Sequence, residues 1–357
     1  MPTISTEFQT IQQAIVQIAT PECTGMGIIW IERGIIITSQ HLVEGVQSVV
    51  VSNSKVAPQL ARVLFTDDVH DLAFVELSGD FDAPKVEFSQ LDIQAGDQVF
   101  ALEKNIKSGT ITKPIHPFFD IEYIQTDISI DTEYTGTPLM SETEGILGIY
   151  SGLLQYGMKG VGYALPTRYI FKAYEDYQKG GSDIATRCRN CMTVVTNKSI
   201  QAESCCQKCG EVVELPSQFP VYEPQGVSRT IEELIEEIGY EPALTRRGPN
   251  NWALIQGSAT IYLAYYEPRG YILGDAFLCK MPEDKATVNR IYEFLLRQNY
   301  LIKGLTFSIY ENDIVLSLII YDRHLNNDTA AELLQTLLER ADYYDNVLVE
   351  ELGAIWK

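Results

Sequence analysis

The chain has 357 residues, and its 27 basic and 48 acidic side chains give a formal net charge of −21. At roughly 100–200 residues per domain, this length predicts two or three domains. Hydrophobic residues make up 45% and charged residues 21% of the chain, which is a globular composition and excludes wholesale disorder. A pI near 4.6 argues against non-specific binding to nucleic acid or to an anionic membrane, because both would repel the protein.

The N-terminus and the cysteines indicate the compartment. The first residues lack the basic and apolar segments of a secretion signal, since Gln9, Gln12, Gln13 and Gln17 interrupt the stretch. A run of about 18 apolar residues, which a membrane-spanning helix needs, is not found. Seven cysteines is an odd number, and five of them lie in residues 188–209, unlike a secreted disulfide framework. We therefore expect a cytoplasmic protein without a membrane partner.

The first half of the chain is rich in short apolar runs. Residues 7–19 predict an amphipathic helix, because Phe8, Ile11, Ile15 and Ile18 lie near helical spacing. From residue 24 to about 166, β-rich runs alternate with turn residues. The runs lie at 28–31, 35–38, 49–51, 72–75 and 146–150. Many short strands at regular spacing predict a barrel or a sandwich.

The second half of the chain has a different pattern. A helix at 167–178 and a Gly-rich linker precede the cysteines, and a Pro-rich linker around residues 216–224 follows them. Helices are then expected at about 230–239, at 283–299 and from residue 328, and strands at 252–255, 259–266, 271–279, 306–310 and 314–321. The order α-β-β-β-α-β-β-α predicts an α+β domain, with a hairpin turn at Glu311-Asn312-Asp313.

Three fragments of the β-rich region are informative together. They are Thr38-Ser39-Gln40-His41-Leu42-Val43-Glu44-Gly45, then Thr66-Asp67-Asp68-Val69-His70-Asp71-Leu72-Ala73, then Asp131-Thr132-Glu133-Tyr134-Thr135-Gly136-Thr137-Pro138. They resemble the His, Asp and nucleophile segments of trypsin-like serine proteases of the HtrA/Deg type, in the same chain order. Residues 145–149 and 161–166 resemble the strands that close the second barrel of that fold. The resemblance spans about residues 20–170 and implies an all-β double barrel.

The resemblance assigns roles by position. His41 would be the general base, Asp71 would orient its imidazole, and Thr135 stands where the family has a serine nucleophile. The added methyl group of Thr135 restricts its χ1 angle. Glu133 replaces a glycine whose backbone N–H helps form the oxyanion hole, and losing one such donor costs about 10²–10³ in rate.

Two functions follow from this altered triad. The first is a pseudoprotease, a barrel that binds protein or peptide without cleaving it. The second is a working cytosolic endopeptidase in which Thr135 attacks, His41 is the general base and Asp71 is the orienting acid. The sequence favours the first, because both the nucleophile and the oxyanion turn depart from the family pattern.

The cysteine-rich segment has the spacing of a zinc ribbon. Cys188 and Cys191 are separated by two residues, as are Cys206 and Cys209, and fourteen residues lie between the pairs. Four thiolates satisfy Zn²⁺ tetrahedrally and leave no open position, which predicts one structural zinc per chain. A redox dithiol pair is the alternative, and Cys205 is an alternative ligand to Cys206. The segment is locally basic but carries no aromatic stacking residues, so nucleic acid is not expected.

Residues from about 227 to 353 resemble the type III secretion chaperone-like fold, including YbjN-like proteins. The resemblance is carried by the fragments 313–318, 325–329 and 333–345. It implies that this domain binds a protein partner or dimerises and performs no chemistry. Tyr262, Tyr265, Tyr266 and Tyr271 either line a peptide groove or are ordinary half-buried strand aromatics. The sequence thus predicts three domains, at 1–179 (double β-barrel), 182–215 (zinc ribbon) and 225–357 (chaperone-like α+β domain).

Overall fold

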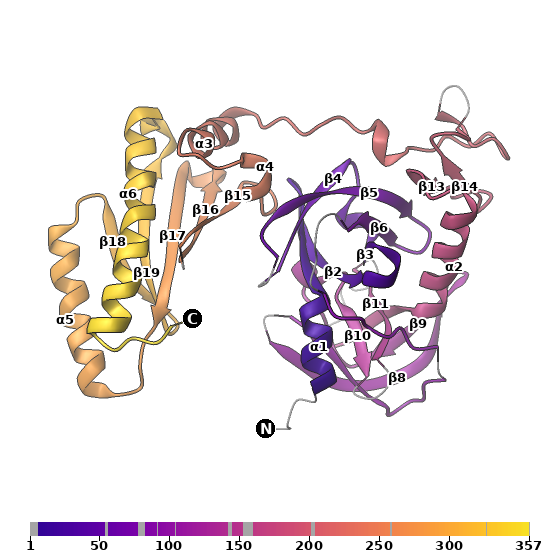
Figure 1. Cartoon of the computed structure of the whole chain (residues 1–357), viewed down its shortest axis with the longest axis horizontal. Coiled ribbons are helices and arrows are strands. Elements are labelled where there is room, and N and C mark those ends of the chain that lie inside the picture. The colour runs from indigo at the N-terminus through magenta and orange to yellow at the C-terminus, as the bar shows by residue number, and fades with distance from the viewer. Residues whose placement is uncertain are drawn as a thin grey trace. The chain divides into compact units, whose positions relative to one another are not determined.

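The computed structural model describes residues 6–53, 56–77, 83–90, 92–103, 105–141, 145–152, 160–200, 204–257, 259–325 and 327–356 (Figure 1). The chain forms two compact units, Met1–Tyr222 and Glu223–Lys357. Each unit has a hydrophobic core of its own.

The first unit contains a six-stranded antiparallel barrel in the order β5-β4-β1-β2-β3-β6, which the pairing of β5 with β6 closes. Its strands are β1 (Ile15–Ala19), β2 (Thr24–Trp30), β3 (Ile35–Thr38), β4 (Ser48–Ser52), β5 (Gln59–Asp67) and β6 (Leu72–Glu76). β-Branched side chains such as Ile28, Ile36 and Val63 are fully buried in it, as suits residues that pack well on a pleated surface.

The helix expected over residues 7–19 is wrong in its second half. Helix α1 (Thr6–Ala14) ends at Ala14, and strand β1 follows it directly. Ile15 and Ile18 lie opposite β2, and Ile18 also lies opposite β4. Only Gln17 of this strand is exposed. The apolar spacing fits a helix as well as a doubly covered strand, so pairing with two neighbours decides the conformation.

A second six-stranded barrel follows in the order β10-β11-β12-β9-β8-β7. Its strands are β7 (Gln98–Leu102), β8 (Ile106–Phe118), β9 (Ile121–Thr126), β10 (Pro138–Ser141), β11 (Gly145–Tyr150) and β12 (Gly162–Pro166). Ile111, Leu139 and Tyr150 fill its interior. Other side chains, including Met140 and Ile149, join the core of the first barrel, so the two barrels pack together. The predicted double barrel is confirmed.

The cysteine-rich segment is attached to the first barrel through its backbone. Helix α2 (Thr167–Lys179) packs into the shared core and leads to strands β13 (Ala185–Arg187) and β14 (Val194–Thr196). Strand β13 pairs with β14 and, in parallel orientation, with β5. The segment therefore extends the sheet of the first barrel and lies in the same compact unit.

The second unit is an α+β domain, as predicted. Its elements are α3 (Gly226–Glu237), α4 (Pro242–Thr245), β15 (Asn251–Gln256), β16 (Ala259–Tyr266), β17 (Tyr271–Lys280), α5 (Lys285–Leu301), β18 (Leu305–Tyr310), β19 (Asp313–Tyr321) and α6 (Asn327–Asn346). The antiparallel sheet has the order β15-β16-β17-β19-β18, and α5 and α6 pack on it through one core. The expected hairpin turn joins β18 to β19, with Tyr310 opposite Asp313. Within the described residues, no helix combines the length and apolar character that crossing a bilayer requires.

Candidate functional site

His41 and Asp71 come from two loops of the first barrel and are in contact. His41 lies in a short 3-10 helix (Gln40–Leu42) just after β3, and Asp71 lies in the turn that precedes β6. Asp71 Oδ1 is 2.8 Å from His41 Nδ1 and also accepts the backbone N–H of His41 at 3.1 Å. An ionised carboxylate only accepts hydrogen bonds, so Nδ1 carries the proton and Nε2 is left to act as a base.

Ser151 completes the surroundings of Asp71. The Ser151 hydroxyl donates to Asp71 Oδ2 at 3.0 Å, so both carboxylate oxygens are bonded and the plane of the group is fixed. Asp71 is buried and has φ 51°, in the left-handed region that Asp tolerates better than most residues. Ser151 is not among the residues predicted from the sequence; its position directly after the strand run at 146–150 was the available signal.

Thr135 approaches His41 without bonding to it. A Cβ atom built at Gly152 would lie 3.0 Å from Thr135 Oγ1 and 3.1 Å from His41 Cε1, so both side chains adjoin the same small volume. Thr135 is fully buried, whereas the His41 side chain is 28% exposed. Within the part of the chain that the structure describes, Thr135 Oγ1 has no hydrogen-bond partner.

The backbone around Thr135 is closed into a turn. The 3-10 helix Thr132–Tyr134 ends there, and the backbone N–H of Thr135 donates to the carbonyl of Thr132 at 3.3 Å. The next amide, that of Gly136, donates to Tyr150 O at 3.1 Å. Glu133 is exposed on this turn. The Thr135 amide, which would serve an oxyanion in the family arrangement, therefore already has an acceptor within the protein.

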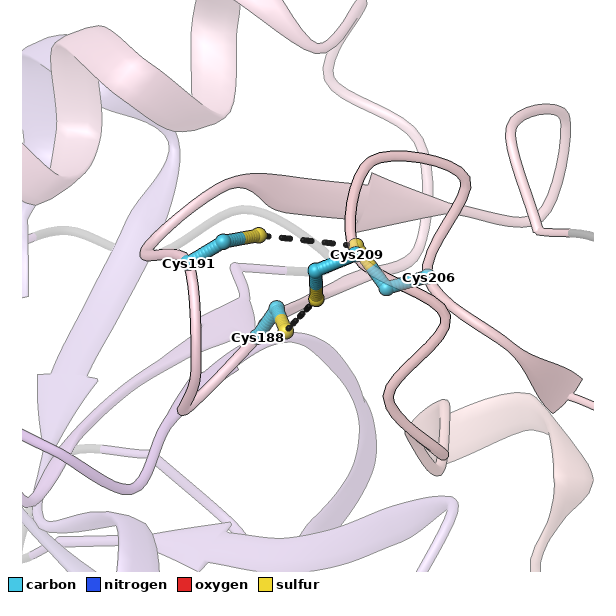
Figure 2. A group of neighbouring side chains, drawn as sticks. All are labelled: Cys188, Cys191, Cys206 and Cys209. Atoms are coloured by element: carbon cyan, nitrogen blue, oxygen red, sulfur yellow. Dashed lines mark hydrogen bonds between the residues drawn. The ribbon is translucent and has the colours of Figure 1, made fainter.

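The four predicted cysteine ligands converge (Figure 2). Their sulfur atoms all lie within 4.8 Å of one another, with Cys188 to Cys209 at 3.5 Å and Cys191 to Cys206 at 3.6 Å. A tetrahedral zinc with Zn–S bonds of about 2.3 Å requires sulfur separations of about 3.8 Å. A disulfide would require about 2.05 Å, and all four cysteines are free thiols. The four cysteines fit a metal ion such as zinc, and Cys205 is not part of the group.

The two cysteine pairs have matching backbone turns. Met192 N donates to Cys188 O at 2.9 Å, and Gly210 N donates to Cys206 O at 2.8 Å. Met192 and Gly210 both have positive φ angles, 61° and 76°. Hydrogen bonds from the side chain and backbone of Thr193 lower the pKa of Cys191 to about 6, which favours the thiolate that a metal ion binds.

The tyrosines singled out in the second unit do not share one environment. Tyr262 and Tyr266 are exposed on β16, and Tyr266 stacks on Tyr271 of β17 with ring centroids 5.0 Å apart. Tyr271 in turn contacts Tyr321 of β19 edge to face. The hydroxyl of Tyr265 instead donates to Asp322 at 3.1 Å. All four tyrosines thus lie on the adjoining strands β16 and β17, but the hydroxyl of Tyr265 is bonded to Asp322, which follows β19.

Comparisons with known proteins agree with the double barrel. Residues 25–149 match the family described as trypsin-like peptidase domain. Serine protease HTRA4 of Mus musculus is 27% identical over 173 residues, covering 44% of this chain and 35% of the relative. Serine protease Do-like HtrA of Bacillus subtilis is 28% identical over 184 residues, covering 45% and 41%. Putative serine protease HhoA of Synechocystis is 29% identical over 157 residues, covering 40% of each chain.

The chain spans between 35% and 41% of the length of these curated relatives. The matched residues include His41 and Asp71 in the first barrel and Thr135 in the second. The first unit of this protein contains a trypsin-like peptidase domain that is distantly related to the HtrA and Deg proteases.

Proposed function

We propose that the double barrel is a pseudoprotease that binds polypeptide without cleaving it. The observation that carries this proposal is the state of Thr135, whose hydroxyl is buried and, among the described residues, has no hydrogen-bond partner. A general base acts on a proton within hydrogen-bond reach, and the pair of His41 and Thr135 lacks that bond.

The oxyanion side of the site supports the same conclusion. The Thr135 amide is bonded to Thr132 O, so the turn must open before that amide can stabilise a developing negative charge. Removing one oxyanion donor costs about 10²–10³ in rate. Weak base catalysis and an occupied amide together leave little of the rate enhancement that a protease needs.

Polypeptide is the proposed ligand because the relatives are named serine proteases or endoproteases. Their ligand is therefore a polypeptide chain. The retained parts of the domain are both barrels and the bonded group of His41, Asp71 and Ser151. We infer that this framework keeps the surface that recognises a polypeptide chain, while the Thr135 hydroxyl is not bonded to His41 and does not act as a nucleophile.

A working protease that uses Thr135 is the second candidate. It is favoured by the intact bonds from Asp71 to His41 and Ser151, and by the shared volume beside Gly152 that Thr135 Oγ1 and His41 adjoin. In this candidate a bound substrate opens the 132–134 turn, the Thr135 amide turns to the substrate, and the hydroxyl reaches Nε2 of His41.

One comparison separates the two functions. Cleavage of a fluorescently labelled unfolded protein is followed for the wild type, Thr135→Ala and Thr135→Ser, with binding measured on the same samples by fluorescence anisotropy. We expect the wild type and the Ala variant to show the same background cleavage and similar affinity. Turnover in the wild type that disappears in the Ala variant would establish the protease instead. Activity that appears only with serine would show that the nucleophile alone had been lost.

The other parts of the protein receive proposals of their own. We propose that the four cysteines hold one structural zinc ion per chain and that the second unit recruits a protein partner or forms a dimer. The sulfur geometry supports the first, and the aromatic contacts across β16, β17 and β19 support the second. Free, closely spaced thiols also suit a cytoplasmic protein.

A further inference from the structure

The segment that begins the cysteine site is also the segment that pairs with the first barrel. Thr186 lies opposite Thr66 in the parallel ladder of β13 and β5, and their hydroxyl oxygens are 2.9 Å apart. Arg187 follows, and Cys188 is the next residue. Three consecutive residues therefore have different roles: Thr186 contacts the barrel, Arg187 is a buried cation, and Cys188 is a candidate metal ligand.

Arg187 joins the cysteine segment to the first barrel through a buried ion pair with Asp67. Its Nε donates to Asp67 Oδ2 at 2.5 Å, and its Nη1 lies 3.3 Å from an oxygen of Asp176 in α2. The side chain of Arg187 is 4% exposed and that of Asp67 is 0% exposed. Nη1 also donates to Met192 O at 3.0 Å, inside the first cysteine turn. Closing that turn on a metal ion therefore fixes an acceptor that holds the guanidinium in place.

Asp67 opens the turn that ends at Asp71. It accepts the His70 backbone N–H through Oδ1 at 3.2 Å and approaches His70 Nδ1 through Oδ2 at 2.8 Å. The adjacent Asp68 accepts from Arg189 Nε at 2.6 Å. The two arginines on either side of Cys188 thus hold the first two residues of a five-residue turn whose last residue orients His41.

We propose that metal loading of the four-cysteine site sets the geometry of the His41–Asp71 pair, with Arg187 as the positioning residue between them. Loss of the metal opens the first cysteine turn, frees Arg187 and loosens the turn at 67–71. The inference rests on the proposed zinc site and not on whether the barrel cleaves polypeptide. By thermodynamic linkage, the coupling is reciprocal, so a change at Asp67 alters the affinity for the metal.

The first test measures the barrel while the metal is changed. Hydrogen exchange is compared for the full chain with zinc and after zinc removal by a chelator under reducing conditions. We expect peptides covering residues 66–72 to exchange about tenfold faster without zinc, and peptides from β7 and β8 to be unchanged. The low-field Nδ1–H proton resonance of His41, assigned with His41→Gln, should broaden in the same sample. Faster exchange confined to residues 185–213, with the His41 resonance intact, would overturn the proposal.

The second test measures the metal while the barrel is changed. Zinc affinity is determined by competition with a chromophoric chelator for the wild type, Asp67→Asn and Asp183→Asn. Asp67→Asn leaves every residue of the cysteine segment in place, and we expect it to weaken zinc binding about tenfold, within the usual range of coupling between sites.

Asp183→Asn is the matched control, because Asp183 pairs at 3.5 Å with Lys198 of the same segment, whose side chain is 83% exposed. It should leave the affinity unchanged. Equal affinities in all three proteins, with folding verified by circular dichroism, would remove the coupling. Neither test measures cleavage, so a failure of the pseudoprotease proposal would be recognised separately, as turnover of the labelled polypeptide.

Discussion

Gly136, the residue after Thr135, is fixed by two separate features of its surroundings. Its φ angle is 86°, and a Cβ atom there would lie 2.1 Å from the carbonyl oxygen of Met26. That carbonyl already accepts a hydrogen bond from Thr38 Oγ1 at 2.7 Å, while Met26 N donates to Thr135 O at 2.7 Å. The turn that carries Thr135 is therefore bonded to β2 through Met26 N, and Gly136 leaves room for the close approach of Met26 O.

Gly136→Ala should destabilise the first unit by roughly 2–5 kcal/mol, combining about 1–2 for the left-handed backbone with about 1–3 for overpacking. Gly45→Ala is the control, because Gly45 has φ 73° but no atom within 4 Å of the place that a Cβ would occupy. It should show only the backbone part of the loss, about 1–2 kcal/mol. Urea unfolding measures both variants, and equal losses would contradict the steric role assigned to Met26.

At the scale of elements, the two cysteine turns explain which thiols form the site. In each turn, the residue directly after the second cysteine has a positive φ angle. The backbone N–H of that residue donates a hydrogen bond to the carbonyl oxygen of the first cysteine. Cys205 lies outside this geometry, since it forms an isolated antiparallel bridge with Val212. Cys206 and Cys209, with two residues between them, thus lie in the same kind of backbone turn as Cys188 and Cys191.

Cys206→Ser should reduce bound zinc from about one ion per chain to a small fraction, because three thiolates and a neutral hydroxyl hold Zn²⁺ poorly. Cys205→Ser differs by one position and should keep its zinc. Metal content measured by atomic emission after dialysis distinguishes the two. Zinc loss from the Cys205 variant, or full zinc in the Cys206 variant, would reverse the assignment of the ligand.

Local patterns in the sequence predict the elements well where one interaction dominates. The strand runs at 35–38 and 72–75 and the helix beginning at Thr167 follow from apolar runs and flanking turn residues. Ile15 and Ile18 lead to a wrong prediction, because their spacing suits a helix whereas their strand pairs with two neighbouring strands. Pairing between distant strands is not visible in a local window, so the expected helix extends too far.

Only part of the candidate site can be predicted from the sequence, because contacts between distant segments are not visible in a local window. The sequence resemblance picks out His41, Asp71 and Thr135, and the structure brings the first two into contact. Ser151 escapes prediction because a serine after a strand has no distinctive spacing. The closed amide of Thr135 escapes it as well, since whether a backbone N–H points inward depends on the turn and not on residue type.

At the scale of the whole molecule, the chain divides between Tyr222 and Glu223. The second unit buries a core that includes Ile261, Leu316 and Leu337, drawn entirely from its own residues. A core of this kind is what independent folding requires, because burial of apolar surface is the main stabilising contribution.

Residues 223–357 expressed alone should therefore fold cooperatively, with a thermal midpoint close to that of the same unit in the full chain. Leu337→Ala, which removes a fully buried side chain, should lower the stability of that unit by about 2–5 kcal/mol and leave the transition of the first unit in place. Calorimetry of the full chain and of the fragment measures both. A single transition that shifts as a whole in the variant would contradict independent folding.

The ion pair between Asp67 and Arg187 also has a consequence for synthesis of the chain, since 120 residues separate its partners. At about 5–20 residues per second, a ribosome needs roughly 6–24 seconds to add the arginine after the aspartate. During that interval the emerging first barrel holds a carboxylate whose cationic partner does not yet exist. His70, three residues from Asp67, is the partner already at hand, and its ring lies 2.8 Å from the same oxygen that Arg187 later binds. His70 is thus available to bond Asp67 before the cysteine segment is made, and it keeps that bond beside Arg187 in the complete protein.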